Sequence, residues 1–129
     1  MKEFQGKLTA TVELTVSQKD TAKAVKSGSL DVLGTPVLLA LFEEATYKCA
    51  QPLLDEGETT VGTKVCVSHD KASAVGEKVM ASAVLEKTEG RKFVFSVSAA
   101  DSKGDVVGKG EIERFVVLSD KFMKRVQGL

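Results

Sequence analysis

The chain has 129 residues, 43% of them hydrophobic and 28% charged, and its 18 basic residues balance 18 acidic ones. This composition predicts one globular domain, residues 1–129. Zero net charge argues against nucleic acid or anionic lipid as a partner, and no apolar run reaches the roughly 20 residues of a membrane span. The first residues, MKEFQGKLTA, lack the apolar core of a secretion signal. Cys49 and Cys66 suggest neither a disulfide framework nor a zinc site. We therefore expect a cytoplasmic protein without metal or cofactor.

Residues 7–16, KLTATVELTV, alternate strictly between polar and apolar side chains. A period of two predicts a strand with one buried face. Residues 17–34 are polar and contain Gly and Ser, which predicts a loop with a short helical turn.

The next segment, LGTPVLLALFEEATYK at residues 33–48, is largely apolar. Pro36 suits the first helical position because the missing N–H of a proline has no partner there. We therefore expect a helix from about Pro36 to Gln51 with Thr35 as its N-cap. The polar turn DEGE at 55–58 closes this region.

Four further strands and a final short helical turn are expected in the rest of the chain. The predicted strands are residues 61–69, 77–88, 92–101 and 105–118. One helix cannot cover both faces of a five-stranded antiparallel sheet, so the sheet should wrap around the helix. This is the α+β hotdog fold. Such domains usually pair edge to edge, so we expect a homodimer, or a tetramer built from dimers.

Two adjacent glutamates on the helix have different surroundings. Helical phase places Glu44 on the polar face, four residues before Lys48, where an ion pair contributing about 0.2–0.5 kcal/mol accounts for it. Glu43 falls at the margin of the apolar face, with no cation three or four residues away. A carboxylate in that position needs either solvent or a donor from another part of the fold.

The only histidine is the candidate partner of Glu43. Four residues of VGTKVCVSH alternate onto one face of the strand: Val61, Thr63, Val65 and Val67. His69 has the same parity and should also look toward the helix, where a structural role and a catalytic one are about equally favoured. Arg114 is likewise in phase with apolar neighbours, so it either pairs with an internal carboxylate or faces a ligand.

Four stretches of the chain form a distinctive series: TPVLLALFEEAT, DEGETTVGTKVCVSH, EGR at 89–91, and the final ER with its apolar run followed by DKF. Together, in this order, they resemble the fluoroacetyl-CoA thioesterase family of hotdog enzymes, and the similarity extends from about residue 30 to about residue 125. The resemblance implies a catalytic set formed by Thr35, Glu43 and His69. It also implies substrate binding by a backbone N–H near Gly62 and by Arg114.

One departure from the family concerns the stretch before the helix. The fluoroacetyl-specific member carries an aromatic lid there, whereas AVKSGSLDVLG at 24–34 contains no aromatic residue. The resemblance therefore implies an acyl-CoA substrate with a short or medium acyl chain, and it does not imply fluoroacetyl-CoA.

Thioester hydrolysis needs a nucleophile, a proton acceptor and donors for the developing oxyanion. Thr35 would attack or orient a water, and the imidazole of His69 would accept the proton. Glu43 is a nucleophile, a base or an orienter of the imidazole. Thr35 and Glu43 are eight residues apart, about 12 Å along a helix axis, so they cannot contact each other directly on one straight helix. Three arrangements would bring them into one site: Thr35 lies off the helix and folds back, His69 bridges between them, or a partner subunit supplies one of them.

Two other functions stay open on this sequence. One is a non-catalytic acyl-CoA-binding protein, and the other is a hotdog hydratase or dehydratase of enoyl or hydroxyacyl thioesters. A purely structural dimerisation domain fits less well, because three polar groups converge on the interior face. Lys121, Lys124 and Arg125 are candidates to contact coenzyme A phosphates, although a solvated chain end also explains them.

Overall fold

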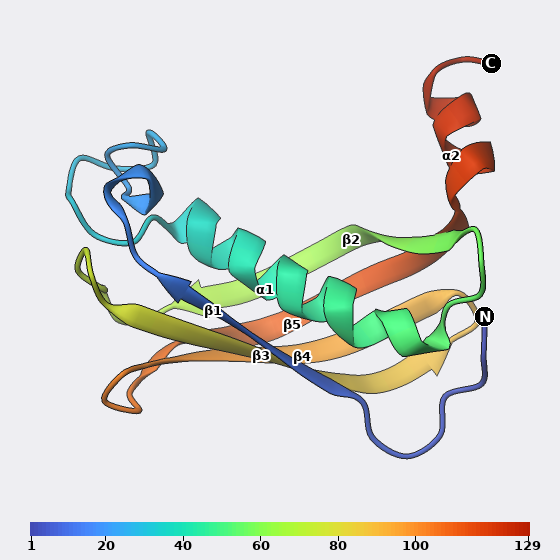
Figure 1. Ribbon diagram of the computed structural model, residues 1–129, viewed down its shortest axis with the longest axis horizontal. Helices are drawn as coiled ribbons and strands as arrows, with labels where there is room; N and C mark the ends of the chain where they lie inside the picture. The colour runs from blue at the N-terminus through green and yellow to red at the C-terminus, as the bar shows by residue number, and fades with distance from the viewer.

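The computed structural model describes all 129 residues and shows an antiparallel sheet curled around one long helix (Figure 1). The strands are β1 (Thr9–Thr15), β2 (Glu58–His69), β3 (Lys78–Glu89), β4 (Lys92–Asp101) and β5 (Val106–Leu118). The helices are α1 (Thr35–Ala50) and α2 (Ser119–Val126), with short 3-10 turns η1 (Gln18–Asp20) and η2 (Gln51–Leu53). The order across the sheet is β1-β3-β4-β5-β2, so β1 and β2 are its edges. The predicted five-stranded sheet around a central helix is confirmed.

The core lies between α1 and the concave face of the sheet. Seven α1 residues are buried: Leu38, Leu41, Phe42, Ala45, Thr46, Cys49 and Ala50. They meet phenylalanines of β4, Phe93 and Phe95, whose rings pack edge to face at 6.4 Å. The alternation of residues 7–16 is also confirmed, since Val12 and Val16 are buried on the same side.

The start of α1 differs from the expectation. The helix begins at Thr35, and Gly34 occupies the N-cap position with no side-chain capping bond. The prediction that Thr35 is the N-cap is therefore wrong. Its hydroxyl is engaged elsewhere, as described below, so it does not bond the helix N–H groups.

The strand ends differ from the predicted ranges by a few residues at most. The largest shift is at β2, which begins at Glu58 rather than at residue 61 because residues 58–60 pair with the last residues of β5. The expected final helical turn is a longer element, α2, of eight residues. It projects from the end of the sheet where β2 begins, and none of its residues is buried (Figure 1).

A β-bulge interrupts β2. Gly62 pairs with Arg114 and Lys64 pairs with Glu113, so Thr63 is an extra residue opposite β5. An extra residue shifts the alternation of side chains beyond it to the other face. Gly62 therefore shares the inner face with Arg114.

The bulge corrects part of the predicted inner face of β2. Val65 lies opposite the fully buried Ile112, so Val65 and the residues that alternate with it, including His69, face inward as predicted. The prediction is wrong for Val61 and Thr63, because they precede the change of parity. Val61 lies opposite the exposed Phe115, on the outer face.

Candidate active site

The beginning of α1 and the end of β2 bring a hydroxyl and an imidazole together. Oγ1 of Thr35 and Nδ1 of His69 are 2.7 Å apart, a short hydrogen bond. His69 pairs with Gly108 of β5, where a β-carbon would collide with the carbonyl of Ser68 and approach Leu38 to 3.1 Å. A glycine opposite the histidine thus lets the strand end lie close under the helix.

The second nitrogen of the imidazole has no partner in this chain. Nε2 of His69 is buried and makes no hydrogen bond. If Nδ1 accepts the proton of the Thr35 hydroxyl, Nε2 must carry the ring hydrogen, and a buried N–H without an acceptor is unfavourable. The pair is therefore incomplete within one chain.

Glu43 has a different partner from the one expected. Its Oε2 lies 3.4 Å from Nη1 of Arg114, and no hydrogen bond joins it to His69. The prediction that His69 pairs with Glu43 is wrong for a single chain. His69 contacts Thr35 at the start of α1, and Thr35 is about 12 Å along the helix axis from Glu43. Arg114 pairs with a carboxylate, as one alternative expected, although the Glu43 side chain is half-exposed rather than internal.

Arg114 is held by several acceptors. Its side chain is nearly buried, Nε donates to Oγ1 of Thr60 at 2.8 Å, and Nη2 donates to the Thr60 carbonyl at 3.1 Å. Nη1 also reaches Oγ1 of Thr46 at 3.5 Å, and the guanidinium lies 6.0 Å from the centre of the Tyr47 ring. Burial lowers the pKa of Arg114, and the charge of Glu43 opposes that shift. The arginine is thus a fixed donor that faces the carboxylate.

Gly62 lies directly beneath that carboxylate. A β-carbon on Gly62 would be 2.5 Å from Oε2 of Glu43 and 3.7 Å from Nη1 of Arg114. Only a residue without a side chain leaves the carboxylate where it is. Gly62 is therefore in contact with the Glu43–Arg114 pair.

An apolar cleft opens beside the hydroxyl of Thr35. It is lined by Ser27, Thr35, Pro36, Leu39, Val65, Cys66 and Val67. Leu39 belongs to the apolar side of α1 but is only half-buried, because it faces this cleft rather than the core. The cleft can hold an apolar chain next to the Thr35–His69 pair.

Sequence reasoning missed Thr60, Thr46 and Tyr47, which surround the guanidinium of Arg114. Thr60 lay outside the predicted strand, and nothing in its local pattern marks an inward side chain. No group of three or more His, Cys, Asp or Glu side chains is arranged to hold a metal ion. No helix is long and apolar enough to cross a membrane.

Comparison with known proteins identifies the family. Residues 16–120 match the family described as fluoroacetyl-CoA-specific thioesterases. The chain belongs to this family. The fluoroacetyl-CoA thioesterase of Streptantibioticus cattleyicolor is 36% identical over 97 residues, which cover 75% of this chain and 69% of that protein.

Solved structures agree with that assignment. The fluoroacetyl-CoA thioesterase FlK superposes with a TM-score of 0.90 at 28% identity, over 98% of each chain. A thioesterase superfamily member from Thermus thermophilus superposes equally well, at 27% identity over 99% of this chain and 96% of the other. A hot-dog-like protein from Thermanaerovibrio acidaminovorans gives a TM-score of 0.83 at 26% identity, over 93% and 88% of the two chains. The hotdog fold of this thioesterase family member is therefore confirmed.

Proposed function

We propose that the protein is a cytoplasmic, single-domain acyl-CoA thioesterase that hydrolyses short or medium acyl-CoA thioesters at the Thr35–His69 pair. The observation that carries this proposal is the 2.7 Å hydrogen bond between the two side chains beside an apolar cleft. Family membership supports the reaction class, because the relatives are thioesterases by name.

In the proposed reaction the acyl group lies in the cleft. The hydroxyl of Thr35, or a water that it holds, attacks the thioester carbonyl while Nδ1 of His69 accepts the proton. The carbon–sulfur bond then breaks and the proton passes from His69 to the leaving thiolate. Where Thr35 itself attacks, a water then hydrolyses the acyl–Thr35 ester: His69 accepts a proton of the water, the acid is released, and the proton returns to the Thr35 oxygen. Gly62 supplies a backbone N–H for the developing oxyanion.

We propose that Glu43 completes the site from a second subunit. Edge strand β2 is unpaired on one side, and antiparallel pairing with a two-fold axis between residues 65 and 66 would bring residue 62 of one copy near residue 69 of the other. Gly62, Glu43 and Arg114 of one protomer would then face Thr35 and His69 of its partner. This arrangement gives the buried Nε2 of His69 a carboxylate acceptor, and such dimers can pair further into tetramers.

The acyl group that we propose is short or medium in length, and nothing in the sequence singles out fluoroacetyl. Residues 24–34 before α1 contain no aromatic side chain that could close over the cleft. One structure of the related enzyme contains fluoroacetate and another contains acetyl-CoA. We expect acetyl-CoA and longer acyl-CoA thioesters to be hydrolysed at least as well as fluoroacetyl-CoA.

The test is thiol release from a panel of acyl-CoA thioesters that includes acetyl-CoA and fluoroacetyl-CoA. His69→Ala and Glu43→Gln should each lower kcat/KM by about 10²-fold or more. Glu44→Gln is the matched control, because Glu44 is exposed and pairs only with Lys48 at 3.1 Å. If both site variants stay within a few-fold of the parent, these residues are not catalytic.

The same assay separates the two other functions. Saturable acyl-CoA binding without thiol release would indicate a binding protein. Addition of water to an enoyl thioester without release of the thiol would indicate a hydratase. Either result would contradict the proposed hydrolysis.

A further inference from the structure

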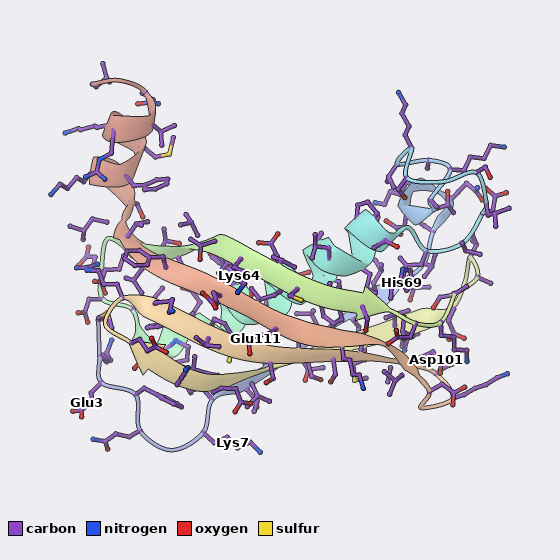
Figure 2. All side chains as sticks on the ribbon, turned by 180° about the vertical axis from the view of Figure 1, so that it is seen from behind. Glu3, Lys7, Lys64, His69, Asp101 and Glu111 are labelled. Atoms are coloured by element: carbon purple, nitrogen blue, oxygen red, sulfur yellow. The ribbon has the colours of Figure 1, made fainter.

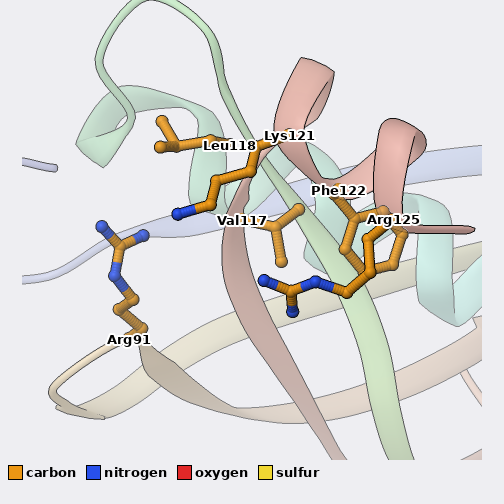
Figure 3. A pocket seen from close by; sticks show the side chains of 6 residues that line it. All are labelled: Arg91, Val117, Leu118, Lys121, Phe122 and Arg125. Atoms are coloured by element: carbon orange, nitrogen blue, oxygen red, sulfur yellow. The ribbon is translucent and has the colours of Figure 1, made fainter. Parts of the chain in front are cut away.

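A groove with three cations lies at the junction of β5 and α2. Its charged residues are Arg91, Lys121 and Arg125, and Val117, Leu118 and Phe122 form its apolar part (Figure 3). We call these six residues the cationic groove. Arg91 comes from the turn between β3 and β4, so the groove joins segments that are distant in the sequence.

The positive charge of the cationic groove is only partly compensated. Nη1 of Arg91 donates to the Val116 carbonyl at 3.3 Å and lies 3.9 Å from a carboxylate oxygen of Glu58. Lys121 and Arg125 make no ion pair within 4.0 Å. They are also four residues apart on α2, where like charges repel each other. A bound anion would relieve that repulsion.

The cationic groove differs from the cluster that the sequence indicated. Lys121 and Arg125 line it, but Lys124 does not, and Arg91 takes its place. Residues 121 and 125 are one turn apart on α2 and both line the hollow, whereas Lys124 lies outside it. Three cations that converge on one hollow are harder to explain as a solvated chain end than three cations in sequence.

The cationic groove is too far from the Thr35–His69 pair of the same chain for one coenzyme A molecule to contact both. The groove lies where β2 begins, and His69 lies at the other end of that strand (Figure 2). The 12 residues of β2 span roughly 35 Å at about 3.3 Å per residue. One coenzyme A molecule is too short to reach from the groove to His69 of the same protomer.

We propose that the cationic groove binds the 3′-phosphorylated ADP end of the coenzyme A whose thioester lies at the Thr35–His69 pair of the partner protomer. This inference rests on the function proposed above. In the antiparallel pairing of β2 with its copy, the beginning of one strand lies beside the end of the other, which brings the groove near the partner's His69. Figure 1 shows α2 projecting beyond β2, the edge that this pairing would use.

The chemistry of the cationic groove suits a phosphorylated nucleotide. Guanidinium and ammonium groups of Arg91, Lys121 and Arg125 can bind the phosphates, with bidentate contacts available to the arginines. The ring of Phe122 offers a surface for the adenine base. In this proposal the acyl and pantetheine parts of the substrate do not contact these six residues.

The first test compares two substrates with the same acyl group. Lys121→Ala/Arg125→Ala should raise KM for the acyl-CoA about tenfold and leave kcat/KM for the acyl-N-acetylcysteamine thioester, which lacks the nucleotide, within twofold. Lys124→Ala is the matched control and should change neither value. An unchanged KM for acyl-CoA, or an equal loss on both substrates, would overturn the inference. If the parent hydrolysed neither substrate, the proposed function would fail instead.

A second test identifies the ligand by inhibition. Adenosine 3′,5′-bisphosphate should inhibit the parent competitively and inhibit the double variant about tenfold more weakly, whereas inorganic phosphate at the same concentration should have little effect. Equal inhibition of the parent by both compounds would show a general anion site and contradict a nucleotide site.

A third test asks which protomer supplies the cationic groove. Mixed dimers of His69→Ala and Lys121→Ala/Arg125→Ala chains contain one site with an intact histidine and an intact groove only if the two come from different protomers. We expect the mixed dimers to regain activity with the low KM of the parent. A KM that stays as high as that of the double variant would overturn the assignment to the partner.

Discussion

The contact between Gly62 and Glu43 shows how a missing side chain can position a carboxylate. Glu43 is half-exposed at the margin of the helix face, and its carboxylate rests above the α-carbon of Gly62 while Arg114 holds it from the side. Thr60 fixes the guanidinium in turn. The position of the Glu43 carboxylate thus depends both on the lack of a side chain at Gly62 and on the guanidinium of Arg114.

Gly62→Ala should separate activity from stability. The new methyl group would displace Oε2 of Glu43, which is the end of a flexible side chain, so we expect the free energy of unfolding to change by less than about 1 kcal/mol. The displaced carboxylate should lower kcat/KM by about 10- to 100-fold. In the Glu43→Gln background the same substitution should cost little more, and an equally large further loss would contradict this account.

Three of the candidate site residues could be singled out from the sequence, but their pairing could not be predicted. Helical phase and strand parity singled out Glu43, His69 and Arg114, because an ionisable residue in an apolar pattern needs an explanation. Whether the imidazole contacts Thr35 or Glu43 depends on where along β2 the helix begins, and that is a tertiary feature. The acceptors around Arg114 were missed for the same reason.

At the scale of elements, Gly110 of β5 allows the backbone of β2 to lie close to it. A β-carbon on Gly110 would collide with the carbonyl of Cys66 and lie 2.6 Å from the α-carbon of Val67. Both atoms belong to the backbone of β2 and cannot swing aside. The close approach of these two strands therefore requires a residue without a side chain at this position.

Gly110→Ala should destabilise the fold by about 1–3 kcal/mol, because the added methyl group overpacks the sheet against backbone atoms. Urea unfolding measures this change as a lower midpoint with an unchanged slope. Ser98→Ala is the matched control, since Ser98 is exposed on β4 and should change the free energy of unfolding by less than about 0.5 kcal/mol. A midpoint for Gly110→Ala equal to that of the control would show that the strands can separate at no cost.

The turn between β4 and β5 is held by charge. Lys71 donates to Asp101 at 2.6 Å and to Asp105 at 2.7 Å, and Asp101 also accepts the backbone N–H groups of Lys103 and Asp105 at 3.0 Å. The hydrogen bond from Lys71 holds the pKa of the Asp101 carboxyl below its usual value. The carboxylate is therefore favoured in the folded state.

This shift predicts a pH dependence of stability. Since the folded pKa of Asp101 lies below the unfolded value near 4, its contribution is fully present above that value and is lost as the pH falls through the folded pKa. Asp101→Asn should be less stable than the parent at about pH 7, and the difference in urea midpoint should shrink by about pH 3. Glu3→Gln, at an exposed position without an ion pair, is the control. A difference that stays constant with pH would contradict the role of the ionised carboxylate.

The element types and their order could be predicted because each has a clear period in the sequence. The helix boundary was missed by one residue because Pro36 is compatible with the second helical position as well as the first. The bulge at Thr63 could not be predicted from alternation, since the pairing with β5 determines which residue is extra.

For the whole molecule, the free edge of β2 and the incomplete imidazole point to the same partner. Val65 faces inward yet is 38% exposed, because it lines the open cleft beside α1. A second copy paired along β2 would cover this edge and complete the site. Assembly and activity are thus linked in the proposed homodimer.

Light scattering should therefore give a mass of at least twice the 13.7 kDa of one chain. Activity per chain should fall on dilution as dimers dissociate, because a lone protomer lacks an acceptor for Nε2 of His69. A monomeric protein with full activity would contradict both the assembly and the shared site.

The extra residue in β2 has a consequence for recognising such proteins. Gly62 and His69 are seven residues apart, an odd number, and in an uninterrupted strand two such residues would point to opposite sides. Here both point inward, because Thr63 adds one step between them. In a strand without the extra residue, an even interval would place both residues on the inner face. The interval and the bulge must therefore change together in a distant homologue that builds the same constellation.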